Sequence, residues 1–195
     1  MALMPFEGSY PITNYFNDPR TRDSYRQRFG SAGHDGIDFA LPCGTPVLAP
    51  DSGWVTIGRD PGGYGDNVQI RTEGGEIWLL GHFSRVDVAE GAWAEAGQQL
   101  GLSGGYPGAP GAGNSSGCHL HASFAGPYWE SNRSNGFNGF EDPLPQLDGS
   151  VGPGGQSGTQ DIVTLPGGFP VQRGHLLAAG ALIGAGVLLL AVNDS

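Results

Sequence analysis

Two short stretches, far apart in the chain, carry side chains that can bind a metal ion, and a shared site would require the fold to bring them together. The first carries His34 and Asp38, and the second carries His119 and His121. β-Branched and aromatic residues with flanking Gly and Pro predict a β-strand for each stretch. Residues two or four positions apart lie on one face of a strand. We therefore expect four metal-competent side chains to converge on one point.

This residue set suits zinc, which binds imidazole nitrogen and carboxylate oxygen and, in catalytic sites, takes three protein ligands and one water. His34, Asp38 and one histidine of the second pair would supply three ligands. The remaining histidine would lie beside the metal as an acid-base group. Either motif alone often marks a solvated strand face or a core histidine. The chain has 5 histidines, however, and three lie in these two stretches, so their joint occurrence favours a zinc site.

The order of the motifs resembles that of the lysostaphin-type (LytM-like) zinc metalloendopeptidases, which cut the peptide cross-links of bacterial peptidoglycan. Three sets of residues carry the resemblance: His34, Asp38 and the Gly-Thr-Pro-Val segment 44–47; His82, Phe83 and Ser84; and Ser116, Gly117, His119 and His121. The resemblance runs from about residue 10 to about residue 144. Ala122 and Ser123 depart from it, because the family commonly has Phe and Glu there. Neither position is a ligand, so the departure concerns packing more than chemistry.

The resemblance implies a role for each of five residues. His34, Asp38 and His121 would hold Zn²⁺, while His82 and His119 would flank the bound water and the substrate. We expect His119 to act as the general base and His82 to orient or stabilise the oxyanion of the tetrahedral intermediate. The two roles could be exchanged.

Composition favours an all-β fold, because 36 Gly and 15 Pro suit many short strands joined by tight turns. We expect strands at residues 45–49, 53–58, 64–72 and 76–82, and short strands or turns over 86–101. The Gly-, Pro- and Ser-rich residues 103–117 form either a wall of the substrate cleft or a disordered excursion. The predicted architecture is a single antiparallel β-sheet-rich peptidase domain with long loops, followed by a C-terminal transmembrane helix.

Charge argues against a nucleic-acid partner, since the formal net charge is -10 and the pI is about 4.6. The basic residues include a cluster formed by Arg20, Arg22, Arg26 and Arg28. Acidic residues are interspersed with them. We interpret this segment as an exposed turn or helix of mixed charge.

Composition also divides the chain into four parts: an N-terminal cap (1–33), the zinc endopeptidase domain (34–146), a Gly/Pro/Ser-rich linker (147–174) and a transmembrane helix (175–192). The helix is predicted from an unbroken run of about 17 apolar or small residues, near the lower limit for crossing a bilayer. A buried core helix is the alternative, but no amphipathic partner follows the linker. Gly180 and Gly184 would permit close pairing with another helix.

Three functions fit these features: an active wall hydrolase, a catalytically inactive peptidase-like wall-binding protein, or a structural membrane protein of a virion. All five expected positions are occupied, which favours the enzyme. The first seven residues lack the charged and apolar regions of a signal peptide. We therefore hypothesise a bacteriophage virion lysin for cell-wall penetration, anchored in the virion membrane or the host envelope. Expected partners are the peptidoglycan peptide, a membrane, and another helix or virion protein.

Cys43 and Cys118 are the only cysteines. If the strands of Asp38 and His121 are antiparallel neighbours, paired residues have nearly constant number sums. The sum is 159 for Asp38 with His121 and 161 for the two cysteines. We therefore predict that the cysteines are near neighbours, on the face opposite the metal residues and not ligands. A disulfide and two free thiols are both compatible with this position.

Overall fold

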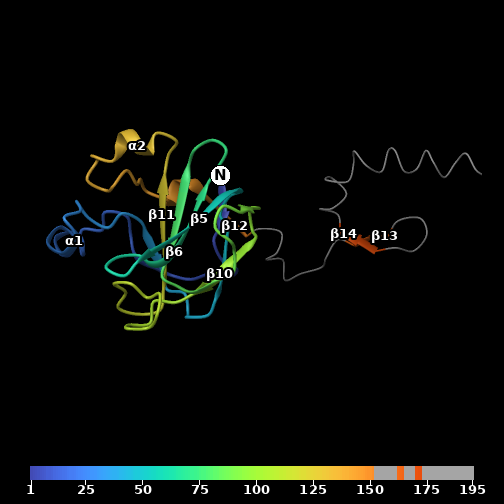
Figure 1. The fold of residues 1–195 in the computed structure, drawn as a ribbon, viewed down its shortest axis with the longest axis horizontal. Helices are drawn as coiled ribbons and strands as arrows, with labels where there is room; N and C mark the ends of the chain where they lie inside the picture. The colour runs from blue at the N-terminus through green and yellow to red at the C-terminus, as the bar shows by residue number, and fades with distance from the viewer. Residues whose placement is uncertain (152–161, 165–169, 173–195) are drawn as a thin grey trace, which may run out of the picture. The chain divides into compact units, whose positions relative to one another are not determined.

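The structure is a computed structural model that describes residues 1–151, 162–164 and 170–172 (Figure 1). The chain divides into two compact units, Met1–Gly155 and Gln156–Ser195. The first unit contains every residue to which the sequence assigned chemistry.

A seven-stranded sheet forms the centre of the first unit, and all its neighbouring strands are antiparallel. A second sheet of three strands packs beside it. The order in the large sheet is β2 (Ile12–Asn14), β3 (Ile37–Phe39), β11 (Leu120–Ala125), β7 (Ile77–Gly81), β6 (Gly65–Arg71), β5 (Gly53–Asp60) and β9 (Trp93–Ala94). The order in the small sheet is β4 (Pro46–Leu48), β10 (Gln99–Ser103) and β8 (Phe83–Val86). The fold is therefore mostly β-sheet, which supports the predicted all-β class in part, since the described residues also include helices and the strands are divided among several sheets.

The core lies on both faces of the large sheet. Alternate side chains of β7 enter two clusters, with Trp78 and Leu80 in the larger one and Ile77 and Leu79 in the smaller one. Because β7 is buried on both faces, it is continuously apolar or small instead of alternating with polar residues. β11 is also buried throughout, but it carries the polar residues His121 and Ser123. β5, which lies nearer the edge, alternates between buried and exposed positions.

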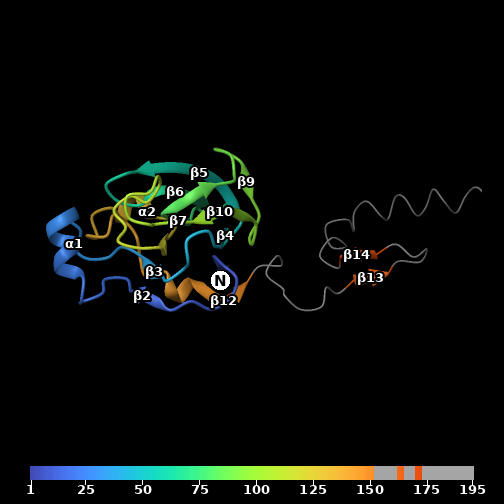
Figure 2. The same cartoon turned by 90° about the horizontal axis from the view of Figure 1, so that it is seen from below.

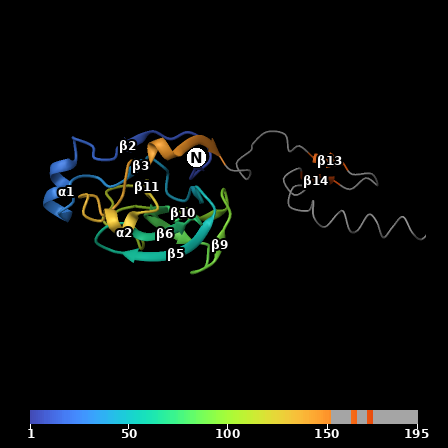
Figure 3. The same ribbon diagram turned by 90° about the horizontal axis from the view of Figure 1, so that it is seen from above.

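The N-terminal 33 residues, predicted only as a cap, contain regular secondary structure. They contain β1 (Ala2–Met4), β2 and the helix α1 (Arg22–Phe29), which ends at Gly30 with φ 68°. α1 buries none of its residues, as expected for the mixed-charge segment, and lies at one end of the unit in all three views (Figures 1, 2 and 3). A second helix, α2 (Trp129–Asn132), and a 3-10 turn (Leu144–Gln146) complete the helical content of the described residues.

Part of the segment expected to be a linker belongs to the folded unit. Leu147–Val151 form β12, which pairs in parallel with β1 beside the N-terminus (Figure 2). Leu147 also packs against the large core cluster. In the second unit, β13 (Ile162–Thr164) and β14 (Pro170–Gln172) form an antiparallel pair.

The expected transmembrane helix, residues 175–192, lies outside the described residues. Within the described ranges, no helix has the length and apolar character needed to cross a bilayer.

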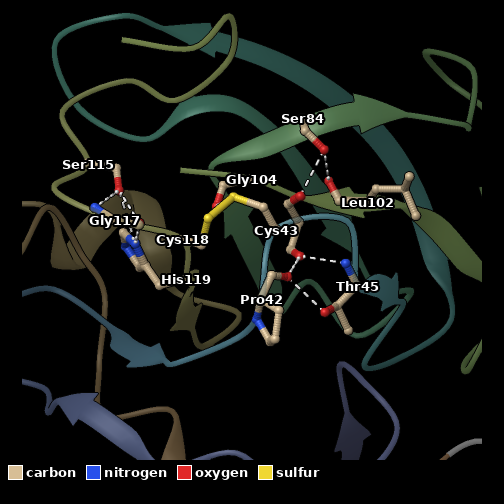
Figure 4. Close-up of a disulfide and its surroundings, with 11 residues drawn as sticks. Pro42, Cys43, Thr45, Ser84, Leu102, Gly104, Ser115, Gly117, Cys118 and His119 are labelled. Atoms are coloured by element: carbon tan, nitrogen blue, oxygen red, sulfur yellow. Dashed lines mark hydrogen bonds between the residues drawn. A yellow bond between two sulfur atoms is a disulfide. The ribbon is translucent and has the colours of Figure 1, made fainter. Parts of the chain in front are cut away.

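The antiparallel pairing on which the cysteine prediction depended is present. His121 of β11 lies opposite Asp38 of β3. Cys43 and Cys118 are close neighbours, with Cα atoms 5.1 Å apart, and form the disulfide that the sequence left open (Figure 4). The bond joins the turn before β4 to the segment entering β11, so it ties the small sheet to the strand that carries His121.

Candidate metal centre

Three side-chain atoms meet on the large sheet at the β3–β11 pair. His34 Nε2 lies 3.2 Å from Asp38 Oδ1 and 3.1 Å from His121 Nδ1. His121 Nδ1 lies 3.0 Å from Asp38 Oδ1, which closes the triangle. Ligand atoms bound tetrahedrally to zinc at about 2.05 Å are about 3.3 Å apart. The spacing of these three atoms therefore suits one small cation, and the group is a candidate metal site.

Hydrogen bonds on the far side of each ring determine which nitrogen faces this point. The carbonyl of Tyr15 can only accept, so His34 Nδ1 donates to it at 3.0 Å and leaves a lone pair on Nε2. His121 Nε2 lies 2.7 Å from Ser123 Oγ and 3.8 Å from Asp35 Oδ1, which favours a proton on Nε2 and a lone pair on Nδ1. Three lone pairs thus face one another, an arrangement that a bound cation stabilises.

The electrostatics of the three candidate ligands also favour a bound cation. Burial raises the pKa of Asp38, but hydrogen bonds and charges of His121 and His34 outweigh it and hold that pKa well below its usual value. Burial lowers the pKa of His34, but the hydrogen bond and charge of Asp38 outweigh it and leave that pKa raised. Asp38 therefore stays ionised, as a carboxylate ligand must.

The convergence does not arise entirely from strand periodicity, as the sequence suggested. His34 precedes β3 and His119 precedes β11, so neither lies within its expected strand. Gly36 allows the close approach instead. A Cβ at position 36 would lie 2.7 Å from His121 Cε1 and 2.5 Å from the carbonyl oxygen of Ala122. Any larger residue would push the His121 ring away.

His82 lies between β7 and β8, with φ 65°, a left-handed conformation that is unusual for a residue with a side chain. It is 6% exposed, and its Nδ1 donates to the carbonyl of Ala112 at 2.8 Å. Burial and the neighbouring His119 and His121 lower the pKa of His82 to about 3. His82 is therefore neutral at physiological pH, with a bare Nε2 that can accept a hydrogen bond.

His119 is the more accessible of the two remaining histidines, since its side chain is 17% exposed. Its Nδ1 donates to the carbonyl of Gly117 at 2.8 Å, and Ser115 Oγ lies 3.1 Å from the same nitrogen (Figure 4). Its Nε2 lies 3.8 Å from Asp38 Oδ1, and its ring centroid lies 4.4 Å from that of His82. The structure thus brings all five predicted residues together.

Comparison with known proteins assigns the chain to a family. The sequence model of Peptidase family M23 matches residues 32–133, which is more than half of the 195 residues. The chain belongs to Peptidase family M23. This family is zinc-dependent, and its peptidoglycan DD-endopeptidases are hydrolases.

Individual relatives support the same family. The DD-carboxypeptidase/endopeptidase Mpg of Neisseria meningitidis is 41% identical over 88 residues, 45% of this chain and 19% of that protein. The peptidoglycan DD-endopeptidase ShyA of Vibrio cholerae is 33% identical over 117 residues, 60% of this chain and 25% of that protein. The chain therefore spans a quarter or less of the length of these two relatives. The structure of LytU shares 30% identity, with a TM-score of 0.53 over 72% of this chain and 86% of LytU.

A hollow leads to two of the three candidate ligands, Asp38 and His121, while His34 is fully buried behind them. Tyr25 and Phe29 of α1 line it, as do residues 114–117 of the long loop. Arg28 Nη2 donates to Asn114 Oδ1 at 2.7 Å, which links α1 to this loop. Of the two interpretations of residues 103–117, a wall of the cleft is the one that the structure favours.

Sequence reasoning missed the residues that hold the candidate ligands in place. Ser123, noted only as a departure from the family pattern, contacts the outer nitrogen of His121. Tyr15 contributes a carbonyl, which no side-chain pattern can indicate. Gly36 had a recognisable signal, because a glycine between two ligand positions marks a close approach.

Proposed function

We propose that this M23 protein is a zinc-dependent endopeptidase that hydrolyses peptide cross-links of bacterial peptidoglycan. The observation that carries the proposal is the convergence of His34 Nε2, Asp38 Oδ1 and His121 Nδ1 within 3.0–3.2 Å, beside two further histidines. The substrate class is supported by the likeness to ShyA, a peptidoglycan DD-endopeptidase.

In this proposal His34, Asp38 and His121 hold the zinc ion, whose chemistry is to polarise a carbonyl and to make water a better nucleophile at neutral pH. His119 Nε2 accepts the proton that the attacking water loses, because this nitrogen is bare and lies on the open side of the site. His82 orients the water through its own bare Nε2. Its low pKa disfavours the protonated form that donation to an oxyanion would require.

A catalytically inactive, wall-binding role is the alternative. Such a protein would need no complete acid-base set next to its metal ligands. His82 retains an unfavourable backbone conformation beside the site, and a strained residue in such a place is more readily explained by catalysis than by folding. We therefore favour the enzyme.

The test is digestion of purified peptidoglycan by the full chain. Hydrolysis of peptide bonds should release new amino termini and no new reducing sugars. Release of reducing ends would identify a glycosidase instead, and binding without release of either would support the alternative.

Metal analysis of alanine variants tests the residue roles. His34→Ala, Asp38→Ala and His121→Ala should each abolish binding of about one zinc per chain, because each removes one of three ligands. His82→Ala and His119→Ala should keep the zinc and lose turnover. Circular dichroism of each variant controls for folding. Full zinc occupancy of a folded Asp38→Ala protein would contradict the ligand assignment.

We also propose that the enzyme acts outside the cytosol, as a virion lysin anchored by residues 175–192. The disulfide supports an oxidising setting, and the apolar run in the sequence supports an anchor. The full chain should then fractionate with membranes and with purified viral particles, whereas a chain ending at Gly155 should not associate with membranes. Recovery of the full chain from neither fraction would count against this location.

A further inference from the structure

The candidate metal centre receives contacts from a part of the chain that precedes the region matched by the family model, residues 32–133. β2 pairs with β3 so that Asn14 lies opposite Asp38. Asn14 is 9% exposed, and its Nδ2 lies 3.3 Å from Asp38 Oδ2. Asp38 Oδ2 is the oxygen that does not take part in the triangle of ligand atoms.

The chemistry of the partners determines the orientation of the Asn14 amide. Asp38 is ionised and can only accept, so the amide must direct its NH₂ group to Asp38. Its oxygen, Oδ1, then faces Thr21, whose hydroxyl donates to it at 3.0 Å. Another acceptor for this hydroxyl, the carbonyl of Asp18, is farther away, at 3.4 Å.

Thr21 occupies the N-cap position of α1, where a threonine hydroxyl usually accepts a hydrogen bond from the first turn of the helix. Here its side chain makes no capping hydrogen bond. The hydroxyl is directed to Asn14 instead, so this threonine contributes to the metal centre in place of the usual cap.

We propose that Asn14 is a positioning residue for the metal centre, and that Thr21 acts through it. By donating to Asp38 Oδ2, Asn14 occupies one carboxylate oxygen and leaves Oδ1 alone for the metal, which keeps Asp38 monodentate. The two hydrogen bonds that connect Thr21 to Asn14 and Asn14 to Asp38 thus set the denticity of the one anionic ligand. This inference rests on the proposed zinc function, and it gives the N-terminal segment a chemical role.

The test measures the zinc dissociation constant of the full chain by competition with a chromophoric chelator. Loss of an outer contact to a ligand typically weakens metal binding about 10- to 100-fold. We expect Asn14→Leu to fall in this range and Thr21→Val to have a smaller effect, while Thr21→Ser restores the wild-type value. The double variant Asn14→Leu/Thr21→Val should bind zinc no more weakly than Asn14→Leu alone, because Thr21 acts through Asn14.

Thr13 offers a matched control. It is the neighbouring residue of β2, and its hydroxyl donates to the main-chain carbonyl of Asp38 at 3.3 Å without touching the carboxylate. Thr13→Val should leave zinc affinity within about twofold of the wild type. X-ray absorption at the zinc edge gives a second readout, since Asn14→Leu should add one oxygen ligand as Asp38 becomes bidentate.

The outcomes separate this inference from the proposed function. A wild-type chain that binds no zinc would refute the metal centre and the inference with it. A wild-type chain that binds zinc, with Asn14→Leu within about twofold of it, would refute the inference alone. If Asn14→Leu does not fold, the Thr21→Val and Thr21→Ser pair decides, because equal zinc affinities of these two variants would overturn the proposal.

Discussion

Removal of the Cys43–Cys118 disulfide should destabilise the first compact unit, Met1–Gly155, here called the peptidase unit, by several kcal/mol. The two cysteines are 75 residues apart in sequence, so the bond closes a long loop in the unfolded chain. For a loop of this length the chain-entropy relation gives about 4.5 kcal/mol at 25 °C. For a unit of about 150 residues this corresponds to a decrease in Tm of about 9 to 18 °C.

The assay is guanidinium unfolding of the full chain with and without dithiothreitol, compared with a Cys43→Ala/Cys118→Ala variant. The oxidised wild type should be more stable than the variant by about this amount, and the reductant should remove the difference. The variant itself should not respond to the reductant. Because Cys118 precedes His119, turnover should fall in parallel.

Two results would refute this reasoning. Thiol titration of the denatured, unreduced protein could reveal two free thiols, which would mean that the bond is not formed. Alternatively, the oxidised wild type and the variant could differ by less than about 1 kcal/mol, well below the loop-closure value. In that case the loop between the cysteines would already be constrained in the unfolded state.

Three further predictions follow from the structure. Gly36→Ala should weaken zinc binding in a competition assay, because its Cβ would lie 2.7 Å from the His121 ring; unchanged affinity would contradict the close-approach explanation. The pKa of His82 is about 3 in the folded state and about 6.5 in the unfolded state, so its contribution to stability is complete above pH 6.5 and is lost as pH falls. In urea unfolding, the free energy of unfolding of the zinc-free wild type should thus decrease by about 2 kcal/mol more than that of His82→Asn between pH 7 and 5. Parallel pH profiles of the two proteins would contradict this. A chain ending at Gly155 should unfold at the same temperature as the peptidase unit of the full chain, whereas a chain ending at Gln146 should have a lower Tm in calorimetry, because it lacks β12; equal Tm values would show that the β1–β12 pair contributes no stability.

Much of the candidate site could be predicted from the sequence, because metal chemistry restricts the choice of residues. The scarcity of histidine and the spacing of His34, Asp38, His119 and His121 pointed to one centre, and the antiparallel pairing assumed for the strands of Asp38 and His121 is the one that β3 and β11 adopt. In an antiparallel pair of strands, one matched pair of residues fixes the partners of nearby residues, so the pairing of Asp38 with His121 also predicted that the two cysteines are neighbours.

Only the tertiary structure revealed how these side chains are held. The close approach at Gly36, the left-handed conformation of His82 and the contact of Asn14 with Asp38 each depend on segments distant in sequence. A pattern of residue types indicates which face of a strand is buried, but it does not indicate which carbonyl or amide will lie behind a ligand. The sequence therefore indicated which residues form the candidate site, while contacts from distant segments, such as that of Asn14 in β2 with Asp38, decided their orientation, because hydrogen-bond partners are chosen by proximity in the fold.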